Sequence, residues 1–175
     1  MTEPLYERLM NPTTRREAFT EVVQKYSPQL YRQIRRLVIW HEDADDVLQE
    51  TFLKAWAGLD HYKGEAQISS WLYRIALNES LAFLAKQKAA VSLDDSEAER
   101  TLESDSWFDG DELQTKLQKA VSQLPEKQRI VFNMKYFDEM KYEEMSEILQ
   151  TSVGALKASY HFAVKKIEEF FENND

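Results

Sequence analysis

The chain has 175 residues, 43% hydrophobic and 30% charged, which suits one or two small globular domains. It contains no cysteine, which excludes disulfide bonds and thiolate metal sites, and its apolar runs are too short for a membrane span. The N-terminus lacks a basic start followed by an apolar run, so we expect no signal peptide and a location in the reducing cytoplasm. Only four glycines and four prolines occur, and this favours long helices over β structure.

The net charge of −9 argues at first against a nucleic-acid binder, because phosphate contacts need lysine and arginine. The acidity is local, however. Residues 91–112 hold nine acidic groups against Arg100 alone, whereas the other 153 residues carry 22 acidic and 21 basic groups. Nearly neutral domains bind DNA weakly by themselves, which points to help from a partner.

Residues 13–88 show helical periodicity throughout. A first apolar stripe ends at Tyr26, and Ser27–Pro28 predicts the start of a second helix. His41–Asp43 is predicted to end that helix and to cap a third, which carries an acidic cluster in its first turns. A polar loop with Gly64 then leads into a fourth helix at about 69–88. The second helix carries three arginines opposite its apolar face: Arg32, Arg35 and Arg36.

Residues 89–112 lose this periodicity and are typical of a solvated acidic linker. Within it, Trp107–Phe108 would either dock on a neighbouring domain or contact a partner. Residues 113–172 form a second predicted domain, which begins with a lead-in helix.

Residues 124–166 of the second domain predict three short helices. Pro125 lies at the start of the first of these helices. Gln150–Ser152 makes a turn before the last helix, with Ser152 as the N-cap of that helix. Two helices joined by such a turn are typical of a helix-turn-helix, whose second helix enters the DNA major groove. A helical hairpin packed for stability alone has the same pattern, so this segment does not decide between the two.

Catalysis finds little support. The three histidines, His41, His61 and His161, are far apart in the sequence and have no partner at metal-ligand spacing, and there is no glycine-rich phosphate loop. The carboxylates near Asp45 are explained by the helix dipole. We therefore expect no enzyme, no metal, no cofactor and no small-molecule substrate.

Residues 60–78 combine aromatic and cationic side chains around Gly64. Rings stack on unpaired bases while lysine and arginine meet phosphates, so this composition suits single-stranded nucleic acid. On composition alone, ordinary helix packing by Trp71 and Tyr73, with Lys63 and Arg74 solvated, is the simpler explanation, and only the pairing with a duplex reader downstream favours nucleic acid.

Two groups of motifs resemble the extracytoplasmic-function (ECF) type of bacterial RNA polymerase sigma factor. The first group comprises DDVLQETFLKAW (45–56), YKG (62–64) and SWLYRIALN (70–78). The second comprises LPEKQR (124–129), YEEM (142–145) and SVGALK (152–157). The resemblance covers about residues 15–88 and 113–170, in the order of the family. It implies an all-α protein with two helical domains, region two (13–88) and region four (113–172), joined by the acidic linker 89–112.

The resemblance also implies site residues. Contact with core RNA polymerase falls on the helix 45–56, through Asp45, Asp46, Gln49, Glu50 and Lys54. Reading and melting of the −10 element, with one base flipped into a loop pocket, falls on Lys63, Glu65, Ala66, Gln67, Ile68, Trp71, Arg74 and Asn78. Reading of the −35 duplex falls on Ser152, Ala155, Lys157, Ala158, Ser159, His161 and Lys165.

The last helix departs from the family, because Ala158–Ser159 and His161–Phe162 stand where arginines are common. The family further implies an anti-sigma factor as a partner, in some cases membrane-bound, and a linker that threads toward the RNA exit path. We expect no membrane insertion by this chain itself. Two other classes remain open: a stand-alone helix-turn-helix regulator that binds duplex operators as a dimer, and a protein-binding adaptor that does not drive initiation.

Overall fold

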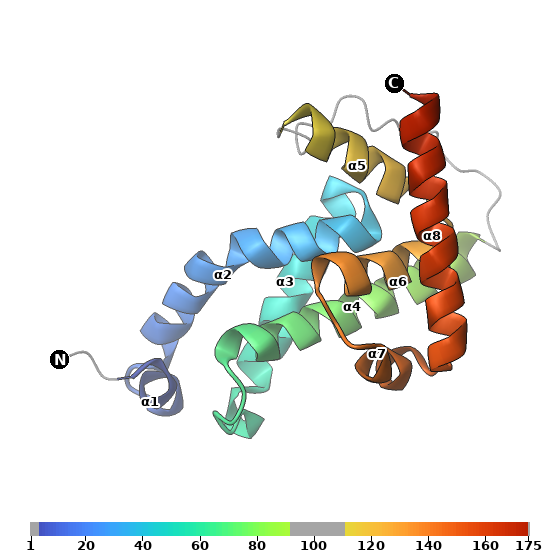
Figure 1. Cartoon of the computed structure of the whole chain (residues 1–175). Coiled ribbons are helices and arrows are strands. Elements are labelled where there is room, and N and C mark those ends of the chain that lie inside the picture. The colour runs from blue at the N-terminus through green and yellow to red at the C-terminus, as the bar shows by residue number, and fades with distance from the viewer. Residues whose placement is uncertain (1–3, 92–110, 175) are drawn as a thin grey trace. The chain divides into compact units, whose positions relative to one another are not determined.

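A computed structural model describes residues 4–91 and 111–174 (Figure 1). Every regular element in these two ranges is helical, which confirms the all-α class expected from the composition. The chain divides into two compact units, Met1–Glu99 and Arg100–Asp175, and each is described by itself. No helix in the described ranges has the length and apolar character needed to cross a membrane.

The first unit is a bundle in which three long helices pack on one another and a short helix joins them at one end. Its elements are α1 (Leu5–Met10), α2 (Arg15–Val38), α3 (His41–Ala57), the 3-10 turn η1 (Leu59–His61) and α4 (Ile68–Val91). Each long helix buries one apolar stripe against the other two, with Val22, Ile34, Ala55 and Leu72 almost inaccessible to solvent.

The prediction that a new helix begins at Ser27–Pro28 was wrong, because α2 runs without interruption through Pro28. A proline inside a helix removes one backbone hydrogen bond and costs about 3 kcal/mol. Val22 and Leu30, which flank it on the buried face, pack against the rest of the bundle and offset this cost. Tertiary packing on α3 and α4 thus overrides the local signal.

Arg35 was predicted on the solvent side of its helix, but it is only 1% exposed. Its guanidinium donates hydrogen bonds to the hydroxyl of Tyr31, at 2.8 Å, and to the backbone carbonyl of Ile39. Ile39 has a positive φ of 78° and ends the helix, so Arg35 binds a carbonyl at the negative end of the helix dipole. His41–Asp43 forms the first turn of α3. The prediction that this segment ends α2 was wrong, because α2 ends at Val38.

The second unit is built around its last helix, against which three shorter helices pack. Its elements are α5 (Glu112–Ser122), α6 (Glu126–Phe132), the π-helical segment η4 (Asn133–Phe137), α7 (Tyr142–Leu149) and α8 (Val153–Asn173). The core joins Val121 of α5 and Phe132 of α6 with Ala163 and Ile167 of α8. This arrangement confirms the three predicted helices and the lead-in helix before them.

The turn between α7 and α8 also follows the prediction. Gln150 ends α7 in the left-handed region, with φ 50°, and Ser152 is the N-cap of α8. The hydroxyl of Ser152 accepts a hydrogen bond from the backbone N–H of Ala155 at 3.2 Å. Residues 89–91 and Glu112, taken from sequence as the ends of the linker, belong to α4 and α5. Trp107–Phe108 lies outside the described residues.

Candidate functional site

The exposed face of α3 carries the residues predicted to contact polymerase. Ala44, Val47, Thr51 and Ala55 bury the opposite side of the helix. Solvent therefore meets a mainly polar strip, and all five predicted side chains are exposed on it: Asp45, Asp46, Gln49, Glu50 and Lys54.

Two features of this face were not expected from the sequence. The ammonium of Lys54 lies 2.5 Å from Oε1 of Glu79 on α4, and this hydrogen-bonded ion pair raises the pKa of Lys54. Leu53, one turn beyond Gln49 and Glu50, is 64% exposed. The face thus combines carboxylates with an apolar side chain. Such a mixed face suits binding of a protein partner better than a purely charged face would.

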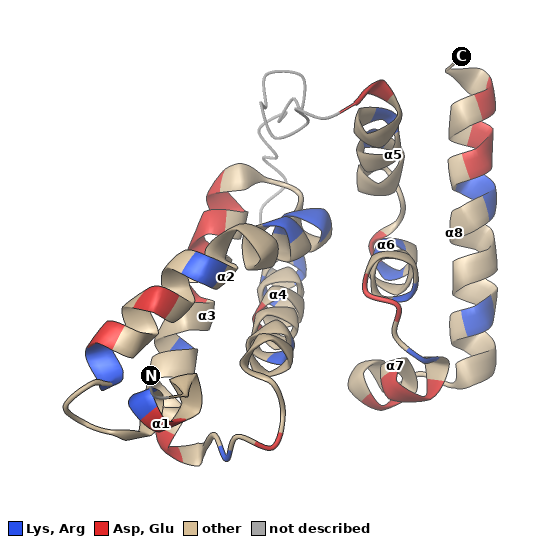
Figure 2. Cartoon of the chain, turned by 60° about the vertical axis from the view of Figure 1, so that its left-hand side comes forward, with Lys and Arg blue, Asp and Glu red and all other residues tan. Residues whose placement is uncertain are grey.

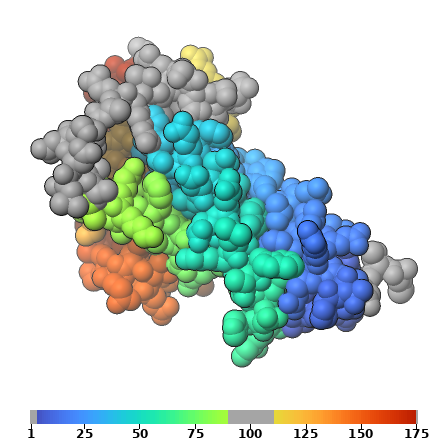
Figure 3. All heavy atoms as spheres, turned by 180° about the vertical axis from the view of Figure 1, so that it is seen from behind, coloured from blue at the N-terminus to red at the C-terminus, as the bar shows by residue number. Residues whose placement is uncertain are grey.

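A pocket of about 390 Å³ opens where the loop before α4 meets α1. Four predicted −10 residues, Glu65, Ala66, Gln67 and Ile68, line it together with Gly64 and Ser69. Its other wall comes from Leu5, Tyr6 and Leu9 of α1 and Tyr26 of α2, together with Tyr62 at the start of the loop. Figure 3 shows the segment after α3, coloured green, directly beside the blue N-terminal helix.

Tyr62 fixes the shape of this loop from inside. The ring is buried, and its hydroxyl donates a hydrogen bond to the carbonyl of Ala66 at 2.5 Å. Burial is the main cause that raises the pKa of Tyr62, so the hydroxyl stays protonated and remains a donor. Gly64 turns the loop with φ 75°, a conformation that side chains rarely adopt.

The remaining predicted −10 residues do not line the pocket. Trp71, Arg74 and Asn78 follow one another along one face of α4, at helical spacing. Trp71 is half-buried and stacks on Tyr62, with 4.7 Å between the ring centroids, so it supports the pocket from behind. Arg74 is half-buried, whereas Asn78 and Lys63 are exposed.

In the second unit, the outer face of α8 carries the residues predicted to read the −35 duplex. Leu156, Ala163 and Ile167 bury its inner face. Of the predicted set, only Ser159 is half-buried, and the others are exposed: Ser152, Ala155, Lys157, Ala158, His161 and Lys165. Figure 2 shows lysines along the N-terminal and middle part of α8 and acidic residues toward its C-terminus.

Phe162 is absent from the predicted set, yet it is 52% exposed on this face. It lies one turn after Ala158 and two turns after Ala155, so three apolar side chains form a stripe among the lysines. The sequence already showed phenylalanine at a position where the family commonly has arginine. Because the structure shows that this side chain is exposed, Phe162 becomes a candidate for contact with DNA.

Among the described residues, no group of three or more histidine, aspartate or glutamate side chains is arranged to hold a metal ion. The histidine of α3, His41, instead shares a 2.6 Å hydrogen bond with Tyr31.

Comparison with protein families decides what this pair of units is. Residues 22–90 match the model of sigma-70 region 2, and residues 114–167 match that of sigma-70 region 4. The ECF RNA polymerase sigma factor SigW of Bacillus subtilis is 32% identical over 157 residues, covering 83% of this chain and 84% of SigW. The chain belongs to the ECF family of sigma factors. This sigma factor is therefore a transcription initiation factor and not an enzyme, and it works with core RNA polymerase and promoter DNA.

Other relatives agree with this membership. The RNA polymerase sigma-H factor of Pseudomonas aeruginosa is 27% identical, with 95% of this chain and 92% of the relative covered. Among solved structures, the sigma factor RpoE in complex with the anti-sigma factor NepR from Bartonella quintana is similar, with a TM-score of 0.63 and 24% identity. That match covers 90% of this chain and 98% of RpoE.

A second solved structure, CnrH in complex with the cytosolic domain of CnrY, has a TM-score of 0.61 and 21% identity. It covers 98% of this sigma factor and 97% of CnrH. At these identities, the two solved structures support the shared fold.

Proposed function

We propose that this sigma factor directs core polymerase to bipartite promoters, using its first unit to open the −10 element and its second unit to read the −35 duplex. The proposal assigns the first predicted domain, extended to the end of α4, to region two and the second, beginning with α5, to region four, with the linker between these two helices. The observation that carries it is the pocket of about 390 Å³ lined by Glu65, Ala66, Gln67 and Ile68. A pocket at this place is what an extruded base requires.

At the −10 element, one base of the non-template strand enters this pocket. The polar side chains of Glu65 and Gln67 and the backbone of the loop meet its edges, and tyrosine rings meet its face. Arg74, Asn78 and Lys63 lie outside the pocket and contact the strand and the fork junction. Trp71 acts in this scheme by holding Tyr62, on which the shape of the loop depends.

Core polymerase binds the exposed face of α3. Asp45, Asp46 and Glu50 meet basic residues of the partner, which steers association and suppresses wrong partners. Gln49 adds a hydrogen bond, and Leu53 adds a small apolar contact beside it. Lys54 keeps its ion pair with Glu79 and contributes by holding α3 against α4.

At the −35 element, α8 lies in the major groove. Lys157 and Lys165 neutralise phosphates, Ser159 and His161 reach base edges, and Ala155 and Ala158 allow close approach. The N-terminus of the helix, capped by Ser152, faces the phosphate backbone. Because arginines are absent from these positions, binding of the second unit alone is weak, and the joint action of both units on polymerase supplies the affinity.

An anti-sigma factor controls this activity, and the protein acts in the cytoplasm, where polymerase is found. Support comes from RpoE, a similar fold that was solved in complex with the anti-sigma factor NepR. CnrH, which also has a similar fold, was solved in complex with the cytosolic domain of CnrY.

The experiment reconstitutes holoenzyme from core polymerase and this chain, selects promoters from a random library, and then measures run-off transcription. We expect promoters that share one −35 and one −10 sequence. A chain that binds duplex operators without polymerase would instead be a stand-alone regulator. A chain that binds core but supports initiation on no promoter would be an adaptor, and either result overturns the proposal.

A further inference from the structure

The pocket has a wall that the region-2 match does not include. That match begins at residue 22, whereas Leu5, Tyr6 and Leu9 of α1 line the pocket. We propose that α1 is part of the base-reading site and that the ring of Tyr6 stacks on the base extruded from the non-template strand. This inference rests on the −10 function proposed above and names a residue that decides how the base is held.

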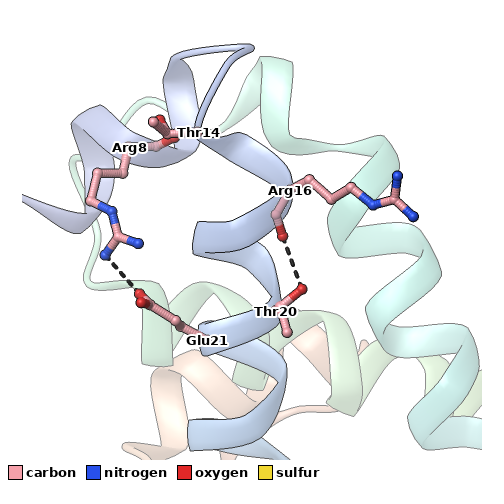
Figure 4. A network of polar contacts seen from close by, with 5 residues as sticks. All are labelled: Arg8, Thr14, Arg16, Thr20 and Glu21. Atoms are coloured by element: carbon pink, nitrogen blue, oxygen red, sulfur yellow. Dashed lines mark hydrogen bonds and ion pairs between the residues drawn. The ribbon is translucent and has the colours of Figure 1, made fainter.

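Helix α1 is attached firmly enough to serve as a wall. Nη1 of Arg8 lies 2.7 Å from Oε2 of Glu21 on α2, as Figure 4 shows. The hydroxyl of Thr14 donates to the carbonyl of Arg8 at 2.8 Å, and Nε of Arg15 donates to the carbonyl of Leu9 at 2.7 Å. The side chain of Leu9 is buried. Six residues would not form a stable helix alone, so these contacts hold α1 in place.

Tyr6 joins this helix to the loop. A Cβ placed on Gly64 would lie 2.8 Å from Cε2 of Tyr6, so the ring packs directly on the loop backbone. The ring of Tyr6 also meets the ring of Tyr62 edge-on, with 5.7 Å between the centroids. Movement of Tyr6 would therefore move the loop that contains Glu65 and Gln67.

Three tyrosines line the pocket, but they are not equally available to a ligand. The ring of Tyr62 is 8% exposed and is already stacked on Trp71. Tyr26 is half-buried in α2. Tyr6 is 39% exposed and meets Tyr62 only with an edge contact, which makes it the ring best placed to stack on an incoming base.

The test uses holoenzyme and a fork-junction DNA made from a selected promoter, with the −10 non-template strand single-stranded. Each −10 nucleotide is replaced in turn by an abasic site, and the position at which wild-type binding falls most marks the extruded base. Tyr6→Ala should weaken binding to intact DNA by about 5- to 150-fold, the range for loss of one aromatic stack. On the DNA with the abasic site at that position, the same substitution should cost almost nothing, because the stacking partner is absent.

A structural role would give a different pattern. If Tyr6 only supports the loop, Tyr6→Ala will weaken binding equally on intact and abasic DNA, and the inference is overturned while the proposed function stands. If no abasic site affects wild-type binding, the proposed function itself fails. These two failures are thus distinguishable.

Two further variants complete the design. Tyr6→Phe keeps the ring and should bind as wild type, whereas Tyr6→Leu fills space beside Gly64 without an aromatic face and replaces Tyr6→Ala if that variant does not fold. The matched control is Glu7→Ala, an exposed neighbour on α1 that does not line the pocket. Glu7→Ala should leave binding to both DNAs unchanged, and a loss equal to that of Tyr6→Ala would contradict a specific role for the ring.

Discussion

The indole of Trp71 stacks on the phenol ring of Tyr62, with 4.7 Å between the ring centroids and 29° between their planes. The hydroxyl of Tyr62 in turn donates to the carbonyl of Ala66, inside the loop that lines the pocket. A side chain near the start of α4 is thereby connected to the loop backbone. The packing of the first unit and the shape of the pocket depend on the same pair of rings.

The Trp71→Ala substitution should impair promoter opening more than core binding. Loss of the stack leaves a space behind Tyr62 and lowers the free energy of unfolding of the first unit by about 2–4 kcal/mol, somewhat less than for a fully buried tryptophan. Thermal unfolding measures the loss of stability, while fork-junction binding and equilibrium binding to core polymerase measure the two functional effects. Trp71→Phe is the matched control that keeps a ring. Equal loss of core affinity and of promoter opening would instead mean that Trp71 serves only the fold.

The Asp46→Arg substitution should weaken binding to core polymerase by about tenfold, because it places a like charge against the basic surface expected on the partner. Asp46 is exposed, so the helical circular dichroism signal should not change. Equilibrium binding to core at two salt concentrations measures the effect, which should shrink at high salt. Glu17→Arg, an exposed reversal on α2, is the control. Unchanged core affinity of Asp46→Arg would remove this face from the interface.

The Gly64→Ala substitution should damage the pocket selectively. The residue has φ 75°, and a Cβ there would lie within 3 Å of the Tyr6 ring, so strain and a clash act together. We expect a loss of about 1–3 kcal/mol in unfolding free energy and a larger loss in binding of single-stranded −10 DNA. Gly154→Ala is the control for stability, because nothing lies within 4 Å of its Cβ position and alanine favours the helix. Wild-type stability of Gly64→Ala would show that the loop relaxes freely.

Phe162 should read thymine through its 5-methyl group, since it lies exposed on α8 beside Ala158. Removing one methyl contact costs about 0.8 kcal/mol, which is roughly fourfold in affinity. Transcription from a selected promoter should fall by about this factor when deoxyuridine replaces the contacted thymine in the −35 element. The Phe162→Ala protein should no longer distinguish the two bases. Discrimination that persists in Phe162→Ala would assign the methyl contact to another residue.

Local signals predicted the second unit well. Ser152 and the break at residues 138–141 act within a few residues, and the structure places the helix ends where these signals indicate. The first unit was predicted less accurately where two elements compete for one residue. Pro28 has a local preference for a helix start, but α2 packs against both α3 and α4 and stays continuous through this residue.

The candidate site divides in the same way. Exposure of Asp46, Gln49 and Glu50 follows from helical periodicity, because the apolar residues of α3 fix which side is buried. The ion pair of Lys54 could not be predicted from the periodicity of α3, since its partner Glu79 lies on another helix. Arg35 was misplaced for a related reason: the carbonyl that it binds belongs to a helix end that the sequence placed several residues later.

By itself, the sequence determined the family, the all-helical class, the two blocks with their acidic connection and the turn before α8. All of these are encoded by the spacing of residues along the chain, and this spacing can be read without knowing the tertiary contacts. The tertiary structure alone decided that six residues near the N-terminus form α1 and that Tyr6 meets Gly64, a residue far from it in the sequence. A pocket is made by side chains brought together from distant segments, and no periodicity within one segment encodes that meeting.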